Sequence, residues 1–175
     1  MKRFVSLLLA VLLAAVSCAA FAEGNTAVSW KLDSAFDYGA GMAVVARNDG
    51  KTEWTTIQAL IESHNNNPVR FEALYENAEI IVVANVNKIS GKAQYNRKTM
   101  QYGYVELGIS SGDIAKVVVE APDEASILNL NVGDLVVASG KLTSITGWKV
   151  DLMNHQSNSQ TTLVPYADYM TPAAE

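Results

Sequence analysis

Cysteine and histidine, the residues most used in metal sites and nucleophilic catalysis, are nearly missing from this chain of 175 residues. It contains one cysteine, Cys18, and two histidines, His64 and His155. No Cys-x-x-Cys or His-x-x-x-His spacing offers a zinc site, and no Gly-x-Ser-x-Gly elbow is present. Asn48-Asp49-Gly50 lacks the alternating acids and the distal Glu of a calcium loop. The sequence therefore predicts no metal, no cofactor and no enzyme.

Long hydrophobic runs are also missing, apart from one at the start of the chain. Lys2 and Arg3 precede the apolar stretch Val5–Val16, and Ala20-Phe21-Ala22 follows as a small-x-small cleavage site. Spanning a bilayer takes about 20 apolar residues, so this stretch is too short. We therefore expect residues 1–22 to be an export signal, with a mature periplasmic or extracellular chain that begins at Glu23.

Cys18 leaves a second route open. Cleavage after Ala22 removes this residue, and the mature chain then has no cysteine for an internal disulfide. Alternatively, Ala15-Val16-Ser17-Cys18 acts as a lipoprotein box and the thiol carries a lipid anchor. Ala15 stands where such boxes usually have Leu, so soluble release is the main expectation and membrane anchoring through Cys18 the alternative.

Negative charge dominates the predicted mature chain. Removing Lys2 and Arg3 from the 13 basic residues leaves 11 against 18 acids, a formal charge of −7. Nucleic-acid affinity comes largely from neutralised phosphates, so a nucleic-acid partner is not expected. The length fits one core. We divide it into an N-terminal extension over 23–77, a barrel over 78–156 and a C-terminal tail over 157–175.

The extension carries signals for two short amphipathic helices. Met42–Arg47 fits a short strand, followed by the turn signal Asn48-Asp49-Gly50. Two apolar sets then have helical spacing, and a polar break separates them. The first set is Trp54, Ile57 and Ile61; the second is Phe71, Leu74, Tyr75 and Ala78. The side chain of Asn67 is suited to cap the second helix. Pro68 is suited to be its first residue, because the φ angle of proline is already close to the helical value.

From Ile80 to Met153 the signals run in the order of a five-stranded OB-fold Greek-key barrel, with a short helix between the third and fourth strands. Alternation predicts which residues face the core. These are Ile80, Val82, Ala84 and Val86; Val105, Leu107 and Ile109; Val117 and Val119; and Trp148, Val150 and Leu152. Tyr102, Tyr104 and Glu106 then face outward. Pro122-Asp123-Glu124 opens the helix, whose Ile127, Leu128 and Leu130 are expected to plug the barrel.

Three segments resemble the tRNA-anti-like family of bacterial OB-fold proteins. They are Asn67–Tyr75, Ile80–Ile89 and, above all, Leu130–Gly140 with its Gly133-Asp134 turn. The resemblance covers about residues 66–154, and the long linker 91–101 departs from it. It implies a mainly β OB-fold preceded by a helix, together with a binding role that involves no catalysis.

The linker and the strand after it contain the candidate ligand face. OB barrels bind oligonucleotides or oligosaccharides on the second and third strands and on the neighbouring loops. The candidates here are Tyr95, Tyr102, Tyr104, Lys92, Arg97, Lys98 and Lys116. Rings of this kind stack on bases or sugars, and the cations suit phosphate or carboxylate groups. The alternative is a solvated hairpin whose lysines keep it soluble and whose tyrosines cover strand edges.

Three functions remain compatible with these residues. The first is an exported binding module of the bacterial envelope, for an oligosaccharide, an anionic oligomer or a partner protein. The second is a structural adaptor that binds no small molecule. The third is a hydrolase that uses outward carboxylates such as Glu106 and Glu120. If Tyr95, Tyr102 and Tyr104 form one exposed patch, ligand binding is favoured; if they are separated, the adaptor is.

Overall fold

A closed barrel of five strands forms the centre of this computed structural model, which describes residues 32–33, 37–95, 97–110, 114–152 and 161–171. Its strands are β3 (Glu79–Ser90), β6 (Tyr104–Gly108), β7 (Lys116–Glu120), β8 (Leu135–Thr146) and β9 (Lys149–Leu152). They pair in the order β3, β6, β7, β9, β8, and β8 pairs back with β3. β7 and β9 are parallel, whereas the other neighbours are antiparallel. With α4 (Ala125–Leu128) between the third and fourth strands, this confirms the predicted OB-like barrel.

The barrel core follows the predicted alternation along most of its length. The inward residues of β3, β6, β7 and β9 are at most 2% exposed. They are Ile80, Val82, Ala84 and Val86; Val105 and Leu107; Val117 and Val119; and Val150 and Leu152. A one-residue slip would turn every one of these side chains out of the core, so this burial holds the pairing register in place.

Three residues predicted to be buried are exposed, because each lies at or just beyond the end of its helix or strand. Ile109 follows the last residue of β6 and Trp148 precedes the first residue of β9, so both lie in turns and are 40% and 44% exposed. Leu128 ends the one-turn helix α4 and is 70% exposed. Leu130 is buried at that end of the barrel, and Ile127 packs against the core.

The N-terminal extension adds two more strands to the same sheet. β1 (Met42–Ala46) and β2 (Thr52–Thr56) form a hairpin, and β1 pairs with β3. The predicted turn joins the two strands, with Gly50 at a φ of +79°. Trp54, predicted as helical, lies in β2 and is 54% exposed. The helix begins only at Ile57, because the Thr56 hydroxyl caps it by accepting from the Ala59 N–H at 3.1 Å.

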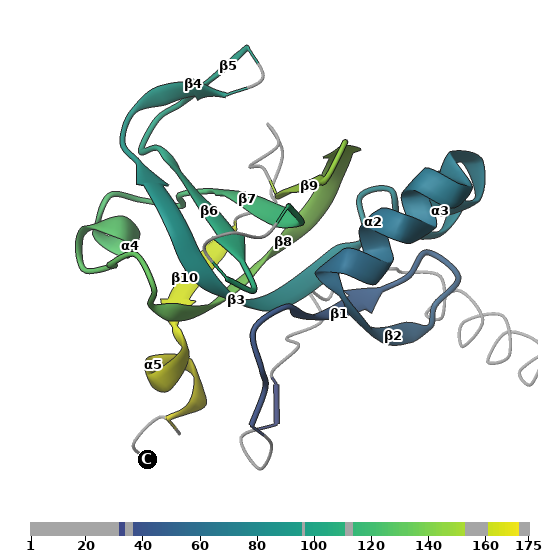
Figure 1. Ribbon diagram of the computed structural model, residues 1–175, viewed down its shortest axis with the longest axis horizontal. Coiled ribbons are helices and arrows are strands. Elements are labelled where there is room, and N and C mark those ends of the chain that lie inside the picture. The colour runs from purple at the N-terminus through teal and green to yellow at the C-terminus, as the bar shows by residue number, and fades with distance from the viewer. Residues whose placement is uncertain (1–31, 34–36, 96, 111–113, 153–160, 172–175) are drawn as a thin grey trace, which may run out of the picture. The chain divides into compact units, whose positions relative to one another are not determined.

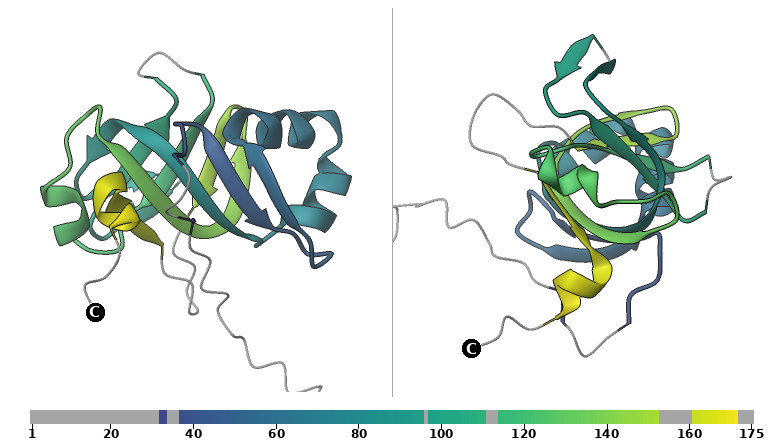
Figure 2. Two further views of the ribbon diagram at one scale, coloured as in Figure 1. Left: turned by 90° about the horizontal axis from the view of Figure 1, so that it is seen from below. Right: turned by 90° about the vertical axis from the view of Figure 1, so that its left-hand side faces the viewer.

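Helices cover both ends of the barrel, as Figures 1 and 2 show. α2 (Ile57–Asn66) and α3 (Pro68–Tyr75) lie at one end and α4 at the other. The buried face of α2 and α3 belongs to the same core as the barrel strands; it comprises Ile57, Leu60, Ile61, Phe71 and Tyr75. The predicted cap of α3 is confirmed, since the Asn67 side chain accepts from the Arg70 N–H at 3.0 Å.

The predicted tail contains regular structure. β10 (Thr162–Pro165) pairs with β8 and is followed by α5 (Tyr166–Met170). Leu163 is buried in the barrel core, and the Thr161 hydroxyl donates to the Glu120 carbonyl at 2.6 Å. The sequence does not predict these contacts, because one short strand with a single buried leucine shows no clear hydrophobic period. The expected export signal, Cys18 and His155 lie outside the described residues.

The linker between the first and second barrel strands forms a hairpin of its own. β4 (Ala93–Tyr95) and β5 (Lys98–Met100) pair as a separate two-stranded sheet that projects beyond the barrel wall (Figure 1). Met100 is fully buried against Tyr104 and Val118, on the outer face of the barrel. Gly103 lets the chain re-enter the barrel: its φ is +110°, and a Cβ there would collide with the Ser90 carbonyl oxygen. The base of the hairpin therefore lies against the face where OB barrels bind ligands.

Candidate functional site

One row of outward side chains crosses all five strands of the barrel beneath this hairpin. The register sets Lys88 of β3 opposite Glu106 of β6, Glu106 opposite Val118 of β7, and Val118 beside Asp151 of β9. Ser144 of β8 completes the row opposite Asp151. Residues that share a face on adjacent strands are direct neighbours. The row therefore places two carboxylates on the outer face with an apolar residue between them.

Three lysine side chains surround Glu106 on this face. Its side chain is only 10% exposed, yet three lysine ammonium groups lie within 4.0 Å of its carboxylate oxygens. Lys116 is closest at 3.4 Å and is hydrogen bonded, whereas Lys88 at 3.9 Å and Lys149 at 4.0 Å are beyond hydrogen-bond length. We call Lys88, Lys116 and Lys149 the lysine cluster. One carboxylate cannot neutralise three ammonium groups, so the cluster carries surplus positive charge.

Asp151 connects the hairpin to the barrel. It is 1% exposed and accepts hydrogen bonds from the Tyr95 hydroxyl at 2.9 Å and from the Ser144 hydroxyl at 2.8 Å. Burial, followed by the charge of Asp151 and this hydrogen bond, raises the pKa of Tyr95, so its hydroxyl stays a donor. A buried carboxylate needs such donors to offset lost hydration. Tyr95 is thus a structural link between β4 and β9.

The three candidate tyrosines do not form one exposed patch. Tyr104 lies on the outer face, as predicted, but Met100 and the ring of Tyr95 cover it and it is only 8% exposed. The Tyr95 and Tyr104 ring centroids are 5.1 Å apart. Tyr102 is exposed and hydrogen bonds Gln101 instead. Because Tyr95 and Tyr104 are committed to packing, they do not offer a stacking platform.

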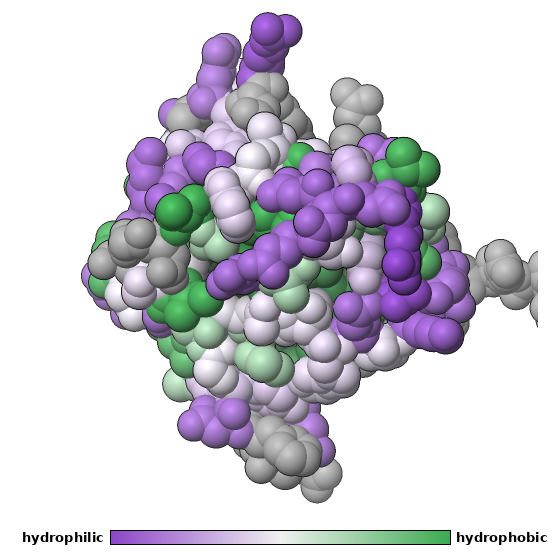
Figure 3. Space-filling view, turned by 45° about the vertical axis from the view of Figure 1, so that its right-hand side comes forward, coloured by the Kyte–Doolittle hydropathy of each residue, from purple (hydrophilic) through white to green (hydrophobic). Residues whose placement is uncertain are grey.

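The candidate cations divide between the hairpin and the lysine cluster. Lys92 and Arg97 are exposed on the hairpin, Arg97 at a φ of +66° in the turn, and Lys98 begins β5. In the space-filling view the hairpin stands at the top with hydrophilic side chains (Figure 3). Lys116 belongs to the lysine cluster instead. The structure thus describes two separate basic regions.

The sequence patterns do not identify Lys149 and Asp151 as residues of the site. Both lie on β9, which the sequence places far from β6 and β7. The parallel pairing of β7 with β9 sets Lys116 beside Lys149 and Val118 beside Asp151. The OB topology implies that pairing. Lys149 and Asp151 alternate with Val150 and Leu152 on the predicted last strand, and this alternation is the sequence signal that places both residues on its outer face.

Glu106 and Glu120, the carboxylates considered for hydrolysis, are not directly opposite each other across β6 and β7. Glu106 lies opposite Val118, and Glu120 lies opposite Tyr104, one step further along the sheet. Glu106 is also engaged by the lysine cluster. Within the ranges that the structure describes, no group of three or more His, Cys, Asp or Glu side chains is placed to hold a metal ion.

These observations define a class of protein, a mainly β module built on an OB-type barrel with a polar, lysine-rich outer face. Neither a family model, nor a curated protein, nor a solved structure matches the chain. The resemblance to the tRNA-anti-like family therefore stays a prediction. No helix among the described residues is long and apolar enough to cross a membrane.

Proposed function

We propose that this protein is an exported, non-catalytic binding module of the bacterial cell envelope, whose barrel face binds an anionic oligomer. Acidic oligosaccharides are the ligand class that fits an exported protein with this face, because their carboxylate or sulfate groups are complementary to the lysine cluster. The observation that carries the proposal is the lysine cluster around Glu106, on the face where OB barrels bind extended ligands. Export rests on the predicted signal in residues 1–22.

The lysine cluster suits a ligand with spaced negative charges. Lys88 and Lys149 are 54% and 40% exposed, and neither ammonium group is within hydrogen-bond length of Glu106. Each ammonium group has three donors, so donors remain for carboxylate or sulfate oxygens. Glu106 offsets the repulsion among the three lysines and holds them together. The cluster is therefore arranged before a ligand arrives, which reduces the ordering cost of binding.

Two exposed aromatic residues lie at opposite ends of this face. Trp148 is in the turn between β8 and β9, and its carbonyl accepts from the Lys116 N–H at 2.9 Å. Tyr102 follows the hairpin at the other end of β6. Both positions belong to the loops that OB barrels use for oligomeric ligands. An oligosaccharide lying across the cluster would meet a ring at each end.

The packing of Tyr95 and Tyr104 favours a second candidate function, that of a structural adaptor. In that case the hairpin and the barrel face form one rigid surface for another envelope protein, without recognition of a glycan. Tyr95 and Tyr104 pack against each other and Tyr104 is buried, so the three tyrosines form no common exposed patch, which supports this role over ligand stacking. Both functions use the same face, and a soluble charged ligand distinguishes between them.

A pair of matched ligands tests the proposal. Oligogalacturonate and its methyl ester share a sugar backbone and differ in charge. We expect the acidic form to bind and the ester to bind much more weakly. The double variant Lys88→Gln/Lys149→Gln should lower affinity roughly 2- to 30-fold, from about 0.2 to 1 kcal/mol per exposed ion pair, and flatten the salt dependence.

The control variant is Lys51→Gln/Lys141→Gln, which removes the same charge from positions outside the cluster. It should leave binding within about twofold of the original protein. Equal losses in the two variants would show that only net charge matters. Equal binding of acid and ester would reject an anionic ligand, and no binding of either, together with capture of a protein on this face, would favour the adaptor.

A further inference from the structure

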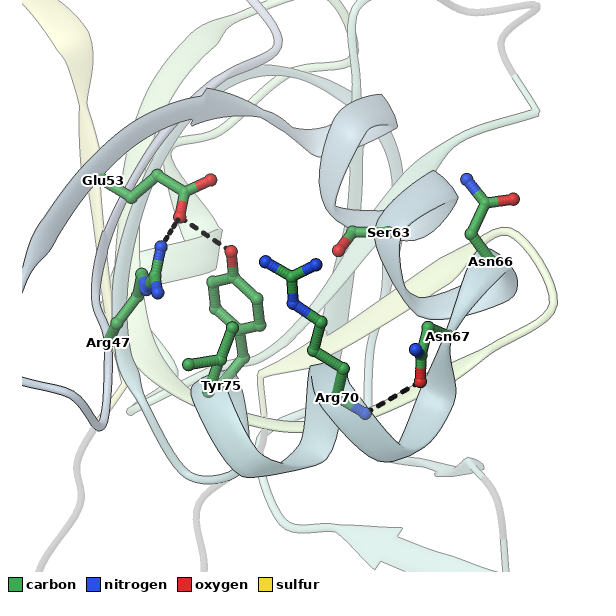
Figure 4. A pocket seen from close by; sticks show the side chains of 8 residues that line it. Arg47, Glu53, Ser63, Asn66, Asn67, Arg70 and Tyr75 are labelled. Atoms are coloured by element: carbon green, nitrogen blue, oxygen red, sulfur yellow. Dashed lines mark hydrogen bonds and ion pairs between the residues drawn. The ribbon is translucent and has the colours of Figure 1, made fainter.

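A second polar site lies away from the barrel face, in the N-terminal part of the structure. A pocket of about 350 Å³ opens between the β1–β2 hairpin and the helices α2 and α3. Figure 4 shows side chains from all three regions turned toward it. Sites for small molecules begin at about this volume, and they usually combine a few convergent polar groups with an apolar wall. Here Leu74 supplies apolar surface.

One wall of this pocket is a fixed network of charged groups. Glu53 Oε2 accepts from Arg47 Nη1 at 3.0 Å and from the Tyr75 hydroxyl at 2.7 Å. Arg47 Nη2 also contacts Asp49 Oδ2 at 2.6 Å. Arg47 Nε is buried and has no hydrogen-bond partner among the described residues. Buried donors in folded proteins normally find a partner, so this one marks an incomplete network at the pocket wall.

The opposite side of the pocket carries a second cation, the exposed side chain of Arg70. The Arg70 backbone N–H bonds Asn67, but its guanidinium forms no hydrogen bond or ion pair with any part of the chain that the structure describes. Figure 4 places that guanidinium between Tyr75 and Ser63, across from Glu53. The positions three and four residues away on either side of Arg70 hold Asn66, Asn67, Ala73 and Leu74. No acidic residue on its own helix therefore competes for it.

The charges around the pocket indicate the chemistry of its ligand. Arg47 is paired with both Glu53 and Asp49, so Arg70 is the one charged group of the lining that has no ion-pair partner among the described residues. A guanidinium binds a carboxylate through two parallel hydrogen bonds. Glu53 Oε1 forms no hydrogen bond within the described residues, and the Ser63 hydroxyl is nearby. These two groups suit hydroxyl or amino groups on the same ligand.

We propose that this pocket binds a small organic acid, with the ligand carboxylate on the Arg70 guanidinium and its hydroxyl or amino groups on Glu53 Oε1 and Ser63. Two classes of small molecule, sugar acids and amino acids, carry this combination of groups. The site is separate from the lysine cluster and does not depend on the function proposed for the barrel face.

Titration of the protein, expressed with its own leader sequence, tests this site. Glucuronate and glutamate are the two carboxylate probes, glucose is the neutral control, and inorganic phosphate is the control for a simple anion. Calorimetry gives affinities, and amide chemical shifts locate the site. We expect glucuronate or glutamate, but not glucose, to shift amides of α2, α3 and β2, and whichever acid binds identifies the source.

Three variants separate the guanidinium from general charge. Arg70→Gln should weaken binding by about tenfold or more, because the paired hydrogen bonds to a charged group are lost. Arg70→Lys keeps the charge and loses the fork geometry, so an intermediate loss is expected. Lys51→Gln removes one positive charge from the neighbouring β1–β2 turn and should change affinity less than twofold.

Three results would overturn the proposal. They are the absence of any shift in this region at millimolar glucuronate and glutamate, equal weakening by Arg70→Gln and Lys51→Gln, or binding of phosphate alone. Thermal melting of each variant shows whether it is folded. If Arg70→Gln does not fold, the comparison of Arg70→Lys with Lys51→Gln decides the outcome.

Discussion

Removing the Tyr95 hydroxyl should release the β4–β5 hairpin from the barrel without unfolding the barrel. In Tyr95→Phe the ring keeps its contacts with Tyr104, at 5.1 Å between centroids, and with the Lys149 ammonium group, at 5.9 Å. The variant therefore isolates the 2.9 Å hydrogen bond to Asp151. Hydrogen bonds to charged groups contribute about 1.5 to 3 kcal/mol. Ser144 still donates to Asp151, which places the expected loss near the lower figure.

Local opening is the expected form of this loss, because β4 and β5 pair with each other as a separate two-stranded sheet and, among the described residues, with no strand of the barrel. Its attachment depends on Tyr95 and Met100. A loss of 1.5 to 3 kcal/mol corresponds to about tenfold to hundredfold faster hydrogen exchange, since each 1.4 kcal/mol is a factor of ten. We expect this acceleration in the amides of β4 and β5, with exchange in β3 and β6 nearly unchanged.

Tyr102→Phe is the matched control. Its hydroxyl bonds Gln101 at the surface, so its removal should change stability by no more than about 0.5 kcal/mol. Exchange in the hairpin should stay at the original rate. The reasoning would be refuted if Tyr95→Phe left hairpin exchange unaltered, or if Tyr102→Phe accelerated it equally, since neither result is compatible with a specific link between Tyr95 and Asp151.

Two further predictions concern alkaline stability and the start of the mature chain. Burial, followed by the hydrogen bond to Glu53, raises the pKa of Tyr75 to about 12, so its stabilising effect is complete below the unfolded pKa near 10 and is lost as the pH rises through 12. Between pH 10 and 12 the free energy of unfolding should fall by about 1 to 3 kcal/mol more in the original protein than in Tyr75→Phe, which keeps the raised pKa of Tyr95, and parallel profiles for the two proteins would contradict this. Intact-mass analysis of protein from envelope fractions should give a chain that begins at Glu23 and carries no lipid; a diacylated Cys18 would instead establish the anchored form.

Sequence periodicity was sufficient for the barrel because its inner face obeys a simple rule. Val86 lies between Asn85 and Asn87, and Val105 and Leu107 lie on either side of Glu106; this period of two marks one buried face and extends to Ile80, Val82 and Ala84 on the same parity. The outer face obeys no such rule here. Val118, Tyr104 and Met100 are buried on it because the hairpin covers them, and neither propensity nor period indicates where a linker will fold back.

The candidate site was predictable in location and only partly in composition. The OB topology places ligands on the second and third strands, and Lys116 was identified on that basis. The aromatic ring makes Tyr95 a candidate for stacking, yet its hydroxyl donates a hydrogen bond to Asp151. Asp151 is more than fifty positions away in the sequence and lies on β9, which the structure places beside β7. Trp148 was assigned to the core from parity, because sequence patterns leave strand ends uncertain by a residue or more. The residues that line the pocket at Arg70 come from three separate elements, so no local sequence pattern predicts this pocket.

The long strand β3 has a consequence for how the chain folds as it is synthesised. Residues Glu79–Val83 pair with β1 on one edge and with β8 on the other, while Asn85–Ser90 pair with β6. A chain is synthesised from its N-terminus, so the apolar segment Ile80–Ala84 emerges from the ribosome long before Leu135–Lys141, which must cover its second edge. Bare edges of apolar strands pair readily with other chains. Until β8 is synthesised, incomplete chains are therefore open to intermolecular association, and a chain truncated before Leu135 would keep that edge permanently.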